Sequence, residues 1–154
     1  MIGKLRRWFK APAEPVEASY DLDSTQLCVA VLLVEIARAD HDHSEVEASK
    51  IRQQLHSKFD LSDNETAKLV DAAEEAAEES VSLHAYTKTL HSQMTYAEKE
   101  AVIEMLWQIA LADQDLDKYE DYMIGKIAEL LYIYRGDVMR LKHRVIESIP
   151  QASQ

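Results

Sequence analysis

The pattern of apolar and polar positions along the chain predicts an all-α protein. Apolar residues recur at intervals of three and four over most of the sequence, as they do along the buried face of an amphipathic helix. Residues 27–34 are apolar on every side, which is typical of a central, fully buried helix. Glycine and proline occur only three times each, so few residues interrupt the predicted helices.

Capping signals divide this pattern into about seven helices. The first is expected from the N-cap Ser24 to about residue 40, and the fourth from about Ser82 to His91. The last helix is expected to begin at Asp137, with Gly136 ending the helix before it. The other four begin with a capping box, in which a short polar residue and a glutamate three positions later cap each other's amides: Ser44 with Glu47, Ser62 with Glu65, Thr95 with Glu98, and Asp117 with Glu120.

The same spacing predicts which side chains form the core. On the second helix the expected buried stripe consists of Val46, Ile51, Leu55 and Phe59. On the sixth helix it consists of Tyr119, Met123, Ile127, Leu130 and Leu131. Trp107 and Cys28 lie inside apolar runs, so both are expected in the core and the thiol is expected to be inert.

One motif occurs twice and sets the predicted architecture. It has the form I-A-x-A-D-x-D-x-x-x-x-E, first over residues 36–47 and again over residues 109–120. In each copy an apolar helix ends at a pair of aspartates, and a new amphipathic helix starts near the glutamate. The repeat therefore predicts two duplicated helical hairpins with a pseudo-two-fold relation, around which the other helices pack.

The acidic turns of this repeat have two interpretations. In the structural one, the two glutamates complete capping boxes and the second aspartate of each turn closes an Asx turn. That interpretation leaves Asp40 and Asp113 unexplained, because a carboxylate beside the free carbonyls of a helix C-terminus costs about 0.3–1 kcal/mol. A bound cation would relieve the repulsion, so the second interpretation is a divalent-cation site at one or both turns.

The predicted metal ligands are the carboxylates of the two turns. They are Asp40, Asp42 and Glu47 at the first turn, and Asp113, Asp115, Asp117 and Glu120 at the second. Oxygen ligands suit Ca²⁺ or Mg²⁺, whereas His41 and His43 would tolerate Zn²⁺, which is the less favoured metal. The spacing differs from that of an EF-hand, which needs a glycine in mid-loop and a glutamate at its twelfth position.

At these residues the chain resembles the tellurite-resistance TerB-like family, and in particular its small stand-alone bacterial branch. The resemblance covers about residues 25–145 and is carried by residues 36–40 with Glu47, by residues 59–62, and in the second half by residues 106–113, 116–120 and 127–131. The family usually has Asp-Gly at each turn, where this chain has His41 and Gln114.

The resemblance implies an all-helical fold with a duplicated core. It also implies an association with tellurite and other chemical stress, and divalent-metal binding through the acidic residues. No enzymatic activity is established across the family. This sequence supports none either, because it has no glycine-rich phosphate loop and no serine in a nucleophile elbow.

Charge limits the partners and the location of the protein. A net charge of −11 argues against nucleic-acid binding and favours cations or a basic protein partner. Residues 1–10 form a basic amphipathic segment, followed by a linker over residues 11–23 and a TerB-like helical domain over residues 24–150. The basic segment can contact a membrane surface weakly, dock on an acidic surface, or stay disordered. A single cysteine and the lack of a long apolar run predict a cytoplasmic protein, at most peripheral to the inner membrane.

These observations predict a non-enzymatic binding or adaptor module of a bacterial stress system that binds divalent cations at its duplicated turns. The alternative is an acidic protein-interaction module without metal, held at the membrane surface by its basic N-terminus. A metal-dependent hydrolase using the same carboxylates is the least supported hypothesis. The sequence names neither the partner nor the oligomeric state.

Overall fold

The computed structural model describes residues 17–39, 45–79, 82–112 and 118–149, with side chains from residue 24 onward. These residues form seven helices and no strand. The helices are α2 (Glu17–Ala39), α3 (Glu45–Phe59), α4 (Asp63–Glu79), α5 (His84–Gln93), α6 (Tyr96–Ala110), α7 (Lys118–Leu130) and α8 (Arg135–Ser148). The all-α prediction is confirmed.

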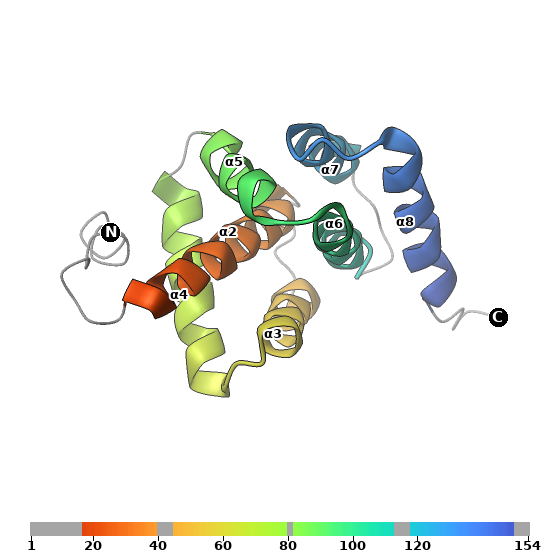
Figure 1. Ribbon diagram of the computed structural model, residues 1–154. Helices are drawn as coiled ribbons and strands as arrows, with labels where there is room; N and C mark the ends of the chain where they lie inside the picture. Colours follow the sequence, from red (N-terminus) through yellow and green to blue (C-terminus); the bar gives the residue numbers. More distant parts are fainter. Residues whose placement is uncertain (1–16, 40–44, 80–81, 113–117, 150–154) are drawn as a thin grey trace.

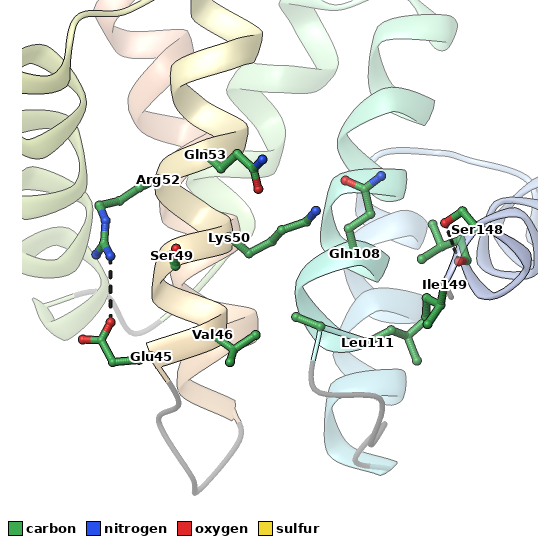
Figure 2. Close-up of a pocket in the computed structure, with 12 residues that line it drawn as sticks. Glu45, Val46, Ser49, Lys50, Arg52, Gln53, Gln108, Leu111, Ser148 and Ile149 are labelled. Atoms are coloured by element: carbon green, nitrogen blue, oxygen red, sulfur yellow. Dashed lines mark hydrogen bonds and ion pairs between the residues drawn. The ribbon is translucent and has the colours of Figure 1, made fainter. Parts of the chain in front are cut away.

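Helix α2 is the centre of the molecule (Figure 1). It packs against α3, α4, α5, α6 and α7, and its residues 27–34 are buried as the apolar run predicts. Helix α8 packs on α6 and α7 instead, so α3 and α8 lie on opposite sides of the C-terminal half of α6 (Figure 2). None of the described helices combines the length and apolarity needed to span a bilayer.

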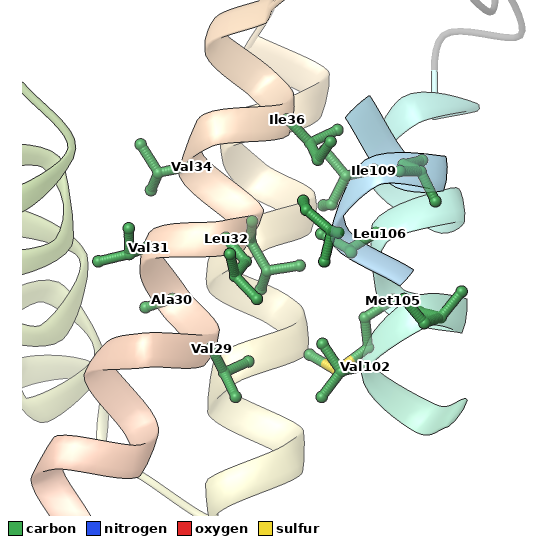
Figure 3. Packing of buried hydrophobic residues seen from close by; sticks show 14 of the residues in the cluster. Val29, Ala30, Val31, Leu32, Val34, Ile36, Val102, Met105, Leu106 and Ile109 are labelled. Carbon is green, nitrogen blue, oxygen red and sulfur yellow. The ribbon is translucent and has the colours of Figure 1, made fainter. Parts of the chain in front are cut away.

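One contact in the core joins α2 to α6 and so connects the two halves of the chain. Figure 3 shows Leu32 and Ile36 of α2 facing Leu106 and Ile109 of α6, and all four side chains are fully buried. Trp107 of the same helix is also buried, and its indole N–H donates to the backbone oxygen of Val138 in α8 at 3.2 Å. Because each such side chain contributes about 1.5–3 kcal/mol on burial, this contact fixes α6 on α2.

Helix α4 packs on α2 through alanines. Ala72, Ala73, Ala76 and Ala77 are buried, and these small side chains let the two helices approach closely. The acidic residues Asp71, Glu74 and Glu78 of the same helix are exposed to solvent.

The two predicted capping boxes whose residues are all described are confirmed. The amide of Ser62 donates to Glu65 Oε1 at 2.9 Å, and the amide of Glu65 donates to Ser62 Oγ at 3.1 Å. Thr95 and Glu98 form the same reciprocal pair at the start of α6. The N-cap residues of the two remaining boxes, Ser44 and Asp117, lie outside the described residues.

Three helix boundaries differ from the prediction. Helix α2 begins at Glu17 rather than Ser24, because nothing after Pro15 interrupts a helix and an acidic first turn suits the positive helix end. Helix α5 begins at His84, whose amide donates to Ser82 Oγ. Helix α8 begins at Arg135, before Gly136, so the predicted cap Asp137 lies in its first turn.

The left-handed turn predicted for Gly136 occurs at Tyr132 instead, with φ of 62°. The next residue, Ile133, is buried, and its amide donates to the oxygen of Ala128 at 2.9 Å. Helix α3 ends in the same way, with Asp60 at φ 54° and a bond from the Leu61 amide to the His56 oxygen. The apolar residue after each turn therefore sets the helix end, as in a Schellman motif.

Candidate functional site

The predicted site lies where α2 turns into α3 and where α6 turns into α7. Most of its carboxylates lie outside the described residues: Asp40, Asp42, Asp113, Asp115 and Asp117. The neighbouring His41 and His43 lie outside them as well. The structure describes the helix ends that border both turns and the two remaining predicted ligands, Glu47 and Glu120.

These two glutamates are fully buried at matching positions. Glu47 is 1% exposed near the start of α3, and Glu120 is 0% exposed near the start of α7. Removing an ionised carboxylate from water costs several kcal/mol unless hydrogen bonds or an opposite charge compensate it. The fold therefore places a buried carboxyl group beside each acidic turn.

Capping alone does not account for this burial. Glu65 and Glu98 occupy the same position in the capping boxes of α4 and α6, and both are exposed. A glutamate can thus cap an N-terminus without leaving the solvent. Burial of Glu47 and Glu120 therefore comes from the packing around the starts of α3 and α7, and not from capping.

Burial of the glutamates corrects the predicted core stripes of both helices. Val46 and Tyr119, placed in those stripes, are 54% and 56% exposed. Successive residues of a helix point about 100° apart, so with Glu47 facing inward beside Ile51, Val46 faces outward. The same rotation of about 100° places Glu120 inward and Tyr119 outward on α7. The hydrophobic pattern alone did not predict this orientation.

The helix ends that border the two turns lie at the same end of the molecule. In Figure 3, Ile36 and Ile109, the first residues of the two motif copies, lie at corresponding ends of α2 and α6 and on facing sides. Figure 2 agrees, since α3 begins and α6 ends at the same side of the view. The duplication itself stays a prediction, although both hairpins are present as paired helices.

Glu47 lines a cavity of about 270 Å³ between α2, α3 and α4. Its floor is apolar, and its other charged residues are Arg38, Arg52, Glu74 and Glu78. The cavity thus brings carboxylates from two helices near the first turn. Two guanidinium groups share the cavity and supply positive charge to it.

A second hollow, of about 260 Å³, lies beside the start of α7. It is lined by Tyr119 and Tyr122, whose rings stack at 6.4 Å, and by Glu35 of α2. Partial burial raises the pKa of Glu35, while the charge of Arg38 lowers it to a lesser extent. The sequence carries no signal for Glu35, because a single glutamate in an apolar run belongs to no motif.

Two further buried groups lie away from the turns. Cys28 is buried, as predicted, and burial raises the pKa of its thiol to about 11, which disfavours the reactive thiolate. Lys99 is buried at the start of α6, and burial lowers its pKa. Its Nζ lies 2.5 Å from His91 Nδ1. Within the described residues, no group of three or more His, Cys, Asp or Glu side chains is arranged to hold a metal.

The fold and the buried turn glutamates define an all-α helical domain with carboxylates at two helix turns. Comparison with protein families is more specific, since the family model described as "Tellurite resistance protein TerB" matches residues 26–143. The chain therefore belongs to the TerB family, a family of non-catalytic helical domains associated with tellurite resistance. No curated protein and no solved structure matches it significantly.

Proposed function

We propose that this protein is a non-enzymatic binding module of the tellurite-resistance type that takes up divalent cations at its two acidic turns. The observation that carries the proposal is the burial of Glu47 and Glu120 at matching positions, each beside a turn that the sequence fills with aspartates. A cation would supply positive charge that both the buried carboxylates and the nearby helix C-terminus favour.

The proposed ligands follow from the chemistry of the donor set. Asp40 and Asp42 would act with Glu47 at the first turn, and Asp113, Asp115 and Asp117 with Glu120 at the second. Such all-carboxylate sets fit Ca²⁺ or Mg²⁺, and Zn²⁺ less well. The role of this chain's residues is to hold the cation between the last turn of one helix and the first turn of the next.

Isothermal titration of Ca²⁺, Mg²⁺, Mn²⁺ and Zn²⁺ into the metal-free full-length protein tests the proposal. We expect saturable binding with a Kd on the order of 10⁻⁶ M, within the range of carboxylate sites for Ca²⁺. Glu120→Gln and the double variant Asp113→Asn/Asp115→Asn should each weaken binding by at least about tenfold, because each removes charged ligands.

The matched control is Asp63→Asn/Asp71→Asn, which removes the same charge from exposed residues of α4 that do not line the cavity beside Glu47. It should bind as the unchanged protein does. Weak, non-saturating heats that are equal in all variants would contradict the proposal and leave the acidic turns with a structural role.

A second candidate function is that of an acidic interaction module that binds no metal. It is favoured by the exposed carboxylates Asp71, Glu74 and Glu78 on α4, which offer a surface to a basic protein partner. Weak contact with a membrane surface through residues 1–10 is part of this alternative. Capture of a basic partner that is lost in Asp71→Asn/Glu74→Gln, together with an absence of metal heats, would favour it over the first.

A further inference from the structure

A groove runs between α3 and α8 with the end of α6 as its floor. It has a volume of about 710 Å³. Leu111 and Ala112 form the floor, Val46 lies on the α3 wall, and Val145 and Ile149 lie on the α8 wall. In Figure 2 the side chain of Val46 points from α3 toward Leu111, and its 54% exposure leaves an apolar surface open to solvent.

The groove continues along α3 and α6. A neighbouring hollow of about 410 Å³ shares Gln108 with it and is lined by Ser57 and Lys58 of α3 and by Ala101 and Glu104 of α6. From Val46 to Lys58 the α3 wall is about 18 Å long at 1.5 Å per residue. This length matches a partner helix of about three turns.

A hydrogen-bonded side chain fixes the distance between α3 and α6. Nε2 of Gln54 on α3 donates to the backbone oxygen of Met105 at 3.2 Å and to Oε1 of Gln108 at 2.5 Å, both on α6. Gln54 is itself buried. The groove is therefore held open in a set geometry, which lowers the cost of binding a partner.

The walls of the groove are positively charged, although the chain is strongly acidic. Figure 2 shows Lys50 pointing across the groove toward Gln108. Lys58, further along α3, lines the neighbouring hollow. Among the described residues neither lysine forms an ion pair. Glu104 of α6, which lines the neighbouring hollow, forms an ion pair with Arg144 at 3.2 Å.

Among the described residues that line the groove, Glu45 and Arg52 do not change this balance. Arg52 points away from α6 toward Glu45, and the two side chains pair at 3.8 Å. The described walls thus combine an apolar floor with two unpaired cations, in a chain with a net charge of −11. Such a groove favours binding of acidic partner segments over basic ones.

We propose that this groove binds an acidic amphipathic helix of a partner protein. The apolar side of that helix would lie on Leu111, Val145 and Ile149, and its carboxylates would face Lys50 and Lys58. This is the helix-in-groove mode, in which anchors spaced three and four residues apart fill the groove. The inference does not depend on metal at the turns.

Fluorescence anisotropy with the full-length protein tests the proposal. The probe is a labelled synthetic helix of about twelve residues with leucines on one face and glutamates on the other. The comparison peptides are a scrambled version without an apolar face and a labelled peptide of residues 1–10, which is amphipathic but basic. We expect the acidic helix to bind at least about tenfold more tightly than either.

The variant Lys50→Glu/Lys58→Glu should weaken that binding by at least about tenfold, because it reverses the charge of the α3 wall. Val46→Asp should also weaken it, since it places a carboxylate on the apolar part of the groove. The matched control, Lys68→Glu/Lys126→Glu, makes the same charge change on exposed residues outside the groove and should bind normally. All of these side chains are at least partly exposed, and circular dichroism verifies that the variants fold.

Three outcomes would overturn the proposal. One is equal binding of the acidic and scrambled peptides, which would show that the net charge of the peptide, and not its apolar face, determines binding. A second is preferred binding of the peptide of residues 1–10, which would make the chain's own N-terminal segment the occupant. The third is self-association in sedimentation that Lys50→Glu/Lys58→Glu abolishes, which would make a second copy the occupant.

Discussion

At the scale of single residues, the position of a glutamate within a capping box does not determine its environment. Glu65 and Glu98 cap their helices from the surface, whereas Glu47 and Glu120 occupy the same sequence position and are fully buried. This difference in exposure depends on how the start of each helix is packed against the rest of the molecule. Helices α3 and α7 begin against the central helix α2, which leaves their first inward position inside the molecule.

A hydrogen-bonded cluster at the start of α8 shows a second residue-scale effect. The hydroxyl of Tyr96 donates to Asp137 Oδ2 at 2.6 Å and accepts from the amide of Tyr134 at 3.0 Å. The hydrogen bond from Tyr96, assisted by Arg140, lowers the pKa of Asp137, while burial and the nearby carboxylate raise that of Tyr96. The cluster joins α6 to α8.

We predict that Tyr96→Phe lowers stability in a pH-dependent way. Asp137 has a folded-state pKa below the ordinary value of 3.8, so its contribution is present above pH 3.8 and is lost as the pH falls through the lower folded-state pKa. The variant should therefore unfold at lower urea than the unchanged protein at pH 7, and this difference should shrink toward pH 3. If the stability difference between the two proteins did not change with pH, the Tyr96 hydroxyl would contribute through packing and not through its hydrogen bond to the ionised Asp137.

At the scale of elements, close packing of α4 on α2 depends on small side chains. Ala73 and Ala76 are fully buried where the two helices meet, while Ala67 on the same helix is exposed. A larger side chain at the buried positions has no space, because protein interiors are packed to crystal-like density.

We predict that Ala76→Leu destabilises the protein by about 1–3 kcal/mol, the usual cost of overpacking a filled interface. Ala67→Leu, the same substitution on the exposed side, should change stability by less than about 0.5 kcal/mol. Urea unfolding followed by circular dichroism measures both. Similar values for the two variants would mean that α4 shifts freely on α2.

At the scale of the whole molecule, one core joins both halves of the chain. Leu32 and Ile36 from the first half face Leu106 and Ile109 from the second, and α8 is attached to the same core through Trp107. Neither hairpin buries its apolar face without the other. The charges are separated at this scale too, since α4 presents carboxylates to solvent while the groove beside α3 presents lysines.

We predict that the protein unfolds as a single cooperative unit. In a Trp8→Phe background, Trp107 fluorescence reports α6 and α8, and far-ultraviolet circular dichroism reports all helices. Leu32→Ala should shift both urea transitions together by about 2–5 kcal/mol, the cost of a cavity in a buried core. Transitions that separate, with only one shifted by the variant, would mean that the two hairpins unfold independently.

Much of the fold could be predicted from the sequence, because helix formation depends on local patterns. The all-α class, the burial of residues 27–34 and of Trp107, and the capping boxes at Ser62 and Thr95 all follow from spacing over a few residues. Family membership also follows from the sequence, since the family model matches residues 26–143. The position of the two acidic turns, each between an apolar and an amphipathic helix, belongs to this group as well.

Tertiary structure alone decided which residues at those turns face inward. Hydrophobicity placed Val46 and Tyr119 in the core, but packing against α2 places Glu47 and Glu120 there and exposes their apolar neighbours. Tertiary packing also decided that Tyr132, rather than Gly136, takes the left-handed conformation after α7, because burial of Ile133 fixes that helix end. The groove between α3, α6 and α8 belongs to the same class, since its walls come from helices far apart in the chain. Such features depend on how faces meet in space, which a one-dimensional pattern of polarity does not specify.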